Sequence, residues 1–79
     1  MIAEEHIAGW AKMGLDEVLG ALCPFGAPIL RKMRGGWFCT VTLSSGAHAG
    51  CECRSQFNNC TPLSAAHECA ASVCRRLNS

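Results

Sequence analysis

Several features that would assign this chain to a functional class are missing from its sequence. No apolar run reaches the roughly 18 residues needed to span a bilayer. Basic and acidic side chains nearly balance, and the net charge of +1 provides no strong attraction to nucleic acid or to an anionic membrane. We therefore expect no membrane partner.

Residues suited to catalysis are also scarce. Asp16 is the only aspartate, and most of the five glutamates fall at expected helix ends or exposed positions. The segment "GGW" lacks the lysine, the serine or threonine, and the helix start of a phosphate-binding loop. Among the pairs that seven cysteines and three histidines allow, His67 with Cys74 best suits nucleophilic catalysis. Because a domain this small rarely forms a substrate pocket, we expect a non-catalytic protein without a cofactor.

The length and composition indicate one small folded domain over residues 1–79. Hydrophobic residues make up 49% of the chain and charged residues 16%, and no repeat, low-complexity segment or linker divides it. The first residues, "MIAEEHIAGW", are acidic and lack the basic-then-apolar order of a secretory signal. If the chain is complete, we expect a cytoplasmic protein whose thiols are reduced.

The first third of the chain predicts a helical region that is interrupted. Residues 3–22 carry apolar side chains at helical spacing, namely Ile7, Trp10, Ala11, Val18 and Leu22. Three glycines weaken a continuous helix. Gly14 followed by Asp16 and Glu17 is typical of one helical turn ending and the next beginning. We therefore expect one broken helix or two short ones, ended by the prolines of "CPFGAP".

The central segment predicts three antiparallel strands. Residues 29–33 form the first strand, and "RGG" supplies a turn that tolerates positive φ. In the second strand one face carries Trp37, Cys39, Val41 and Leu43. The third strand extends this inward face with Ala49, Cys51, Cys53, Ser55 and Phe57. The opposite face then carries Phe38, Thr40, Thr42, Glu52, Arg54 and Gln56.

The segment "TPLSAAHECAASVCRRL" predicts a C-terminal helix. Thr61 is suited to N-capping and Pro62 to the first helical position. An apolar stripe follows at spacings of three and four, formed by Leu63, Ala66, Ala70, Val73 and Leu77. The order helix, three antiparallel strands, helix predicts an α+β fold in which the C-terminal helix packs on one sheet face.

Seven cysteines in 79 residues are the most unusual feature of the composition. The predicted strands turn Cys39, Cys51 and Cys53 inward, and the last helix places Cys69 and Cys74 on or beside its apolar stripe. Free cysteine behaves as a small hydrophobe and is among the most buried residue types. Side-chain direction therefore explains five of the seven as reduced core residues, which is the interpretation we favour.

Two other roles for the cysteines stay open. The segments "HAGCEC" and "HECAASVC" suggest a small zinc-binding module through His48, Cys51, Cys53, His67, Cys69 and Cys74. No CxxC pair, the usual zinc knuckle, occurs in the chain. A disulfide between facing strands would join Cys39 to Cys51 or Cys53. Those last two cannot easily bridge each other, because alternate residues of a strand lie about 6.5 Å apart.

Two basic groups and the outer sheet face are the candidate binding surfaces. The first hairpin carries "RKMR", and two arginines close the last helix. Such charges also protect a strand edge against pairing, and a docking patch is the functional interpretation. The candidate partner-binding residues are Arg31, Lys32, Arg34, Thr40, Thr42, Glu52, Arg54, Gln56, Arg75 and Arg76. A homodimer is also possible, in which this sheet face, with Phe38, packs against the same face of a second copy across a two-fold axis.

The order α-β-β-β-α, with "GGWFCTVTLSSGAHAGCECRSQF" leading into "TPLSAAHECAASVCRRL", resembles the double-stranded-RNA-binding domain. The resemblance implies recognition of A-form RNA by its shape and phosphates, notably from lysines at the start of the last helix. The corresponding "TPLSAAHE" holds no lysine or arginine. Nucleic-acid binding is therefore our second hypothesis, with the contacts Arg31, Lys32, Arg34, Arg54, Arg75 and Arg76.

The same stretch is similar to small uncharacterised proteins encoded by bacteriophages and prophages. Their "GGW-aromatic" strand, second alternating strand and "TPxxA" helix start are matched at Gly35, Gly36, Trp37, Phe38, Thr61, Pro62 and Ala65. This resemblance implies a phage accessory protein that docks on and inhibits a host protein or ribonucleoprotein machine, anti-CRISPR inhibitors being one class. Our first hypothesis is therefore a non-catalytic protein-binding module, which the near-zero net charge suits better than a phosphate track.

Overall fold

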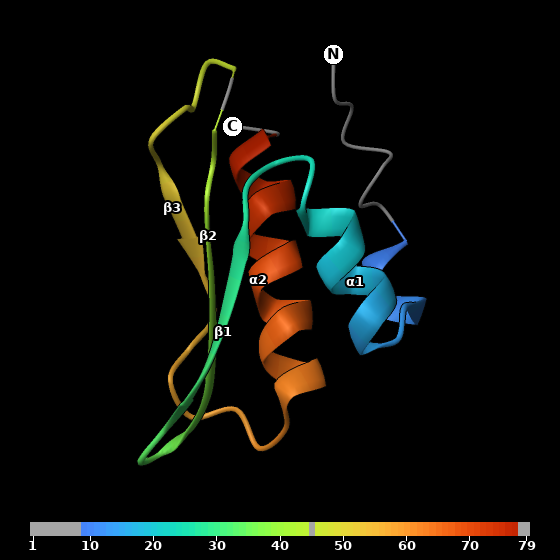
Figure 1. Cartoon of the computed structure of the whole chain (residues 1–79), viewed down its shortest axis with the longest axis vertical. Coiled ribbons are helices and arrows are strands. Elements are labelled where there is room, and N and C mark those ends of the chain that lie inside the picture. The colour runs from blue at the N-terminus through green and yellow to red at the C-terminus, as the bar shows by residue number, and fades with distance from the viewer. Residues whose placement is uncertain (1–8, 45, 78–79) are drawn as a thin grey trace.

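The computed structural model of the chain describes residues 9–44 and 46–77. Its elements are a 3₁₀ turn η2 (Trp10–Lys12), the helix α1 (Leu15–Leu22), the strands β1 (Pro28–Met33), β2 (Gly36–Thr42) and β3 (Glu52–Arg54), and the helix α2 (Pro62–Leu77). The predicted α+β class and the order helix, three strands, helix are confirmed (Figure 1). In the described part of the chain, no helix has the length and apolar character needed to cross a bilayer.

The N-terminal helical region is interrupted where the sequence predicted a break. Residues 3–8 of the expected helix lie outside the described residues. After η2, the backbone is extended at Met13 and at Gly14, which is the N-cap of α1. Asp16 and Glu17 then occupy the first turn of α1, where carboxylates complement the positive end of the helix dipole.

The three strands pair antiparallel in the order β1-β2-β3, so β1 and β3 are both edge strands. Met33 pairs with Gly36 across a turn made by Arg34 and Gly35. Gly36 has a φ of 147°, and a Cβ there would lie 2.6 Å from the carbonyl oxygen of Asn59. Both the backbone conformation and the close approach therefore require glycine at this end of the hairpin.

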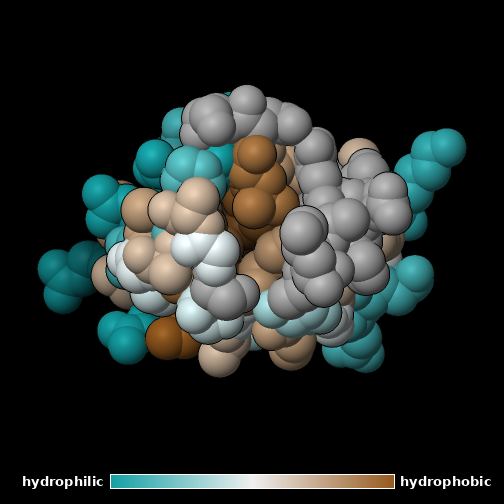
Figure 2. All heavy atoms as spheres, turned by 90° about the horizontal axis from the view of Figure 1, so that it is seen from above, coloured by the Kyte–Doolittle hydropathy of each residue, from teal (hydrophilic) through white to brown (hydrophobic). Residues whose placement is uncertain are grey.

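Both helices lie on the same side of the sheet (Figure 1). α2 packs along β2 and β3, and α1 packs mainly against α2. Seen from the end where α2 terminates, apolar residues fill the centre and hydrophilic side chains extend at the rim (Figure 2). The buried core consists of Val18, Leu22, Phe25, Cys39, Val41, Leu43, Cys53, Ala65, Ala66, Cys69, Ala70 and Val73.

The start of α2 confirms the predicted cap. The Ser64 N–H donates to the Oγ1 of Thr61 at 3.1 Å, and Pro62 is the first helical residue. On the predicted stripe, the two central alanines and Val73 are buried, and the leucines at its ends pack half-buried against the core. Because α2 presents mostly alanine and cysteine to the sheet, it can approach the strands closely.

The third strand is shorter than predicted, and its end changes one side chain's direction. Cys53 and Ser55 are buried as expected, but strand pairing stops at Arg54. The Oγ of Ser55 accepts a hydrogen bond from the N–H of Cys39 at 2.9 Å. In a continuing strand, the backbone carbonyl of Ser55 would accept this hydrogen bond instead. The prediction that Phe57 points inward is wrong, because this residue is 52% exposed and its ring centroid lies 4.6 Å from that of Phe38.

Candidate functional site

The sheet face that the helices leave uncovered carries outward side chains from all three strands. Cross-strand partners point to the same side of a sheet. Thr40 pairs with both Ile29 and Arg54, Phe38 with Arg31, and Thr42 with Glu52. We call this surface the outer face, formed by Ile29, Arg31, Met33, Phe38, Thr40, Thr42, Glu52, Arg54 and Phe57. It brings together five of the predicted binding residues, Arg31, Thr40, Thr42, Glu52 and Arg54.

The apolar part of the outer face was not identified from the sequence. Ile29 is 48% exposed, Met33 39% and Phe57 52%. These are the exposed large hydrophobic residues of the described chain, and all three lie on the outer face. Residues 28–33 show no clean alternation, so only the pairing with β2 reveals which side Ile29 and Met33 take.

Positive charge surrounds this apolar surface. Arg31 and Arg34 are exposed along β1 and its turn. On β3, the Nη1 of Arg54 lies 3.7 Å from the Oε1 of Glu52, and their side chains are 60% and 52% exposed. An exposed pair at this distance contributes little to stability, so both groups stay available to a partner. Three arginines against one glutamate leave the outer face and its margin with an excess of positive charge.

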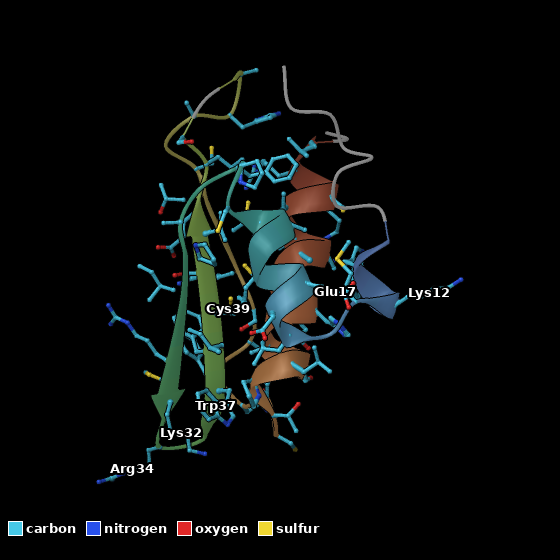
Figure 3. All side chains as sticks on the ribbon, turned by 45° about the vertical axis from the view of Figure 1, so that its right-hand side comes forward. Lys12, Glu17, Lys32, Arg34, Trp37 and Cys39 are labelled. Atoms are coloured by element: carbon cyan, nitrogen blue, oxygen red, sulfur yellow. The ribbon has the colours of Figure 1, made fainter. Side chains whose placement is uncertain are left out.

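The basic "RKMR" segment does not form one patch. Lys32 pairs with Trp37 and takes the side of the sheet opposite Arg31. Its Nζ lies 5.4 Å from the centroid of the Trp37 ring, so this lysine covers the indole at the hairpin end, while Arg34 extends from the turn (Figure 3). Arg31 and Lys32 therefore present their charges on opposite sides of the sheet.

The remaining predicted residues lie around α2. Gln56 was expected on the outward side of a strand, but it follows the end of β3 and lies in the loop that leads to α2. Arg75 and Arg76 are in the last turn of α2, at the opposite end of the molecule from Arg34 (Figure 1). A helix of 16 residues is about 24 Å long, so Arg75 and Arg76 lie far from Arg34 at the hairpin turn.

A groove runs between the end of β3 and α2. Its volume is about 350 Å³, and it is lined by Arg54, Ser55, Gln56, Glu68, Ala71 and Arg75. The Oε1 of Glu68 accepts the backbone N–H of Gln56 at 3.0 Å and the Nδ2 of Asn59 at 2.9 Å. This groove is not predictable from the sequence, because its walls come from a strand end and from a helix that follows a loop.

The buried cysteines form part of the core between the sheet and α2. Cys39 and Cys69 have no exposed surface and Cys53 is 1% exposed, whereas Cys51 and Cys74 are half-buried, and all seven cysteines are thiols. The Sγ of Cys69 donates to the carbonyl oxygen of Cys53 at 3.5 Å.

Two of these thiols resist ionisation. A hydrogen bond with Cys39, together with burial, raises the pKa of Cys69 far above its ordinary value. Burial also raises the pKa of Cys53, and the nearby positive charge of Arg76 partly offsets this effect. These thiols therefore stay protonated and unreactive near neutral pH, as expected of core residues.

The histidine and cysteine set singled out for zinc does not assemble in the described part of the chain. Within residues 9–44 and 46–77, no three side chains of histidine, cysteine, aspartate or glutamate come together as a metal site. The Nε2 of His67 lies 2.9 Å from the carbonyl oxygen of Met13. The His67 and Trp10 rings pack edge to face, with their centroids 5.5 Å apart. Because a carbonyl only accepts, Nε2 carries the proton, and His67 joins α2 to the segment around η2.

Comparisons of the chain with protein-family models, with curated proteins and with solved structures found no match. The candidate site therefore stands on its own geometry.

Proposed function

We propose that this chain is a non-catalytic protein-binding module that docks on a partner protein through the outer face of its sheet. One observation carries the proposal: Ile29, Met33 and Phe57, the exposed large hydrophobic residues of the described chain, gather on the sheet face opposite α1 and α2. An apolar centre with a polar margin is the usual anatomy of a protein interface. Contiguous exposed apolar surface on a small protein commonly marks an interaction site.

The charges around this centre indicate the chemistry of the partner. Arg31 and Arg54 lie among the apolar side chains, and Arg34 extends beyond them at the hairpin end. A second copy of the chain would bring another face with an excess of positive charge against this one, whereas an acidic rim on another protein would pair with the arginines. We therefore propose a partner with an apolar surface ringed by acidic side chains.

A second candidate function follows from the aromatic rings on the same face. Phe38 and Phe57 lie beside arginines, an arrangement on which the bases of single-stranded nucleic acid also stack. We rank it second, because Ile29 and Met33 form the rest of the apolar surface and aliphatic side chains offer no stacking platform. A net charge of +1 also favours this function little, because a weakly basic protein displaces few counterions from a nucleic acid and so gains little binding energy from their release.

On the resemblance to small proteins of bacteriophages and prophages, we extend the proposal to a biological role. The partner is then a host protein machine, and the docked chain inhibits it in the manner of an anti-CRISPR protein. An apolar docking surface on a compact chain of 79 residues is compatible with such blocking by occupation of a surface, which needs no catalytic group.

The proposal is tested by affinity capture from a bacterial lysate with matched variants. Ile29→Ser and Arg31→Glu alter the outer face at exposed positions, whereas Lys12→Glu makes the same charge change on the far side of the molecule (Figure 3). We expect a discrete protein that the wild type and Lys12→Glu retain equally after nuclease treatment. Ile29→Ser and Arg31→Glu should lose it. Equal retention by all four chains overturns the proposal, and nuclease-sensitive retention supports the nucleic-acid candidate instead.

A further inference from the structure

The groove beside β3 combines two features that suit one kind of ligand. The first is charge. Arg54 and Arg75 line the groove, and its carboxylate, Glu68, is already engaged by two hydrogen-bond donors. Among the residues that the structure describes, no carboxylate oxygen comes within 4.0 Å of Arg75. The groove therefore offers guanidinium groups to an anion, and Arg–carboxylate pairs form strong, often bidentate hydrogen bonds.

The second feature is the unpaired edge of β3. The Leu43 N–H donates to the carbonyl of Cys51, and the Ser55 N–H donates to the carbonyl of Cys39. Residues 51 and 55 therefore direct their backbone groups toward β2, and by alternation the backbone groups of Glu52 and Arg54 point to the open edge. An edge strand with open backbone groups is a template for pairing with an extended peptide.

We propose that the groove binds an extended acidic segment of the partner protein, which pairs with the open edge of β3 as a short additional strand. A carboxylate side chain that enters the groove contacts Arg54 and Arg75, which both line it. The inference rests on the proposed function, because it names the part of the partner that reaches beyond the outer face. Arg54 belongs to both surfaces, so a partner seated on the outer face can continue into the groove without a gap.

The size of each feature explains why both are needed. β3 has only three residues, so strand pairing alone supplies few hydrogen bonds. A groove of about 350 Å³ is at the small end of the range for ligand sites and holds a few side chains at most. Ala71 lines it with a single methyl group, which leaves space for a carboxylate side chain between the strand and the helix.

The test uses the purified full chain under reducing conditions and a labelled peptide of sequence Thr-Val-Glu-Val-Glu-Val-Thr, followed by fluorescence polarisation. We expect saturable binding that Arg75→Gln weakens by roughly tenfold, the effect of losing one charge-assisted hydrogen-bonded pair. Lys12→Gln removes one positive charge on the far side of the molecule and should leave the affinity unchanged (Figure 3). A peptide with lysine in place of both glutamates should not bind.

Strand pairing is tested separately with two N-methylated peptides, each methylated along one edge of the extended chain. Pairing with β3 predicts that one of them loses binding and the other keeps it. Equal binding by both peptides, equal loss in Lys12→Gln and Arg75→Gln, or no saturable binding up to about 1 mM overturns the inference. So does displacement of the peptide by oligouridylate in an Arg75-dependent manner, which would indicate a nucleic-acid site. Failure of the peptide together with loss of the captured protein in Arg31→Glu would leave the proposed function standing without the groove.

Discussion

Asn59 organises the loop that joins β3 to α2 and thereby shapes the groove. Its side chain is buried, with the residue only 6% exposed. The Nδ2 donates to the carbonyl of Gln56 at 3.0 Å and to the Oε1 of Glu68 at 2.9 Å, and the Oδ1 accepts from the Oγ of Ser64 at 2.6 Å. The backbone carbonyl of Asn59 also accepts the Trp37 N–H at 2.8 Å. Asn59→Ala would remove the three side-chain bonds and keep the backbone bond.

The expected cost follows from those three bonds. A hydrogen bond contributes roughly 0.5–1.5 kcal/mol net, so Asn59→Ala should lower the free energy of unfolding by about 2–4 kcal/mol. A domain of this length has a total stability of roughly 4–12 kcal/mol, so the loss is a large fraction of it. Urea unfolding under reducing conditions should show a lower midpoint with an unchanged m-value. The melting temperature should fall by roughly 4–8 °C for each kcal/mol.

The neighbouring Asn58 supplies a matched control, since it has the same chemistry and is exposed. Asn58→Ala should change the free energy of unfolding by less than about 0.5 kcal/mol. If Asn59→Ala destabilises no more than Asn58→Ala, the three hydrogen bonds do not support the loop, and the reasoning that derives the groove's shape from Asn59 fails.

Two further expectations concern the thiols and the cap of α2. Because the pKa of Cys69 is raised above the ordinary 9.0, its contribution to stability is complete below that pH and is lost progressively above it. Between about pH 8 and 10, urea titration should show the free energy of unfolding falling by a total of roughly 1.4 kcal/mol for each such thiol. Cys69→Ala should reduce this slope and the exposed Cys23→Ala should not; equal slopes in the two variants contradict the assignment. Thr61→Ala should cost about 1 kcal/mol, whereas Thr61→Ser, which keeps the hydroxyl, should cost little; equal losses would mean that the 3.1 Å cap bond contributes nothing.

The outer face was predictable where the strand pattern is regular. Thr40, Thr42, Glu52 and Arg54 alternate with inward residues, so the period of two assigned their direction correctly. Ile29 and Met33 were missed because β1 has apolar residues on both sides of its pattern, and its register against β2 decides which of them are covered. Phe57 was assigned to the wrong side because the strand ends where the Ser55 hydroxyl accepts the N–H of Cys39. No local sequence pattern predicts this strand end.

The sequence by itself determined the features that depend only on interactions between residues close together in the chain. The break at Gly14, the glycine of the hairpin, the cap at Thr61 and the inward cysteines follow from backbone sterics, capping and periodicity, which act over a few residues.

Only the tertiary structure decided the end of β3, the exposed side of β1, and the meeting of Arg54 with Arg75. Each depends on which atoms a distant element brings within hydrogen-bonding or packing distance: Cys39 for Ser55, β2 for β1, and α2 for the groove. Such contacts join residues far apart in the chain and become fixed only when the sheet and α2 pack together.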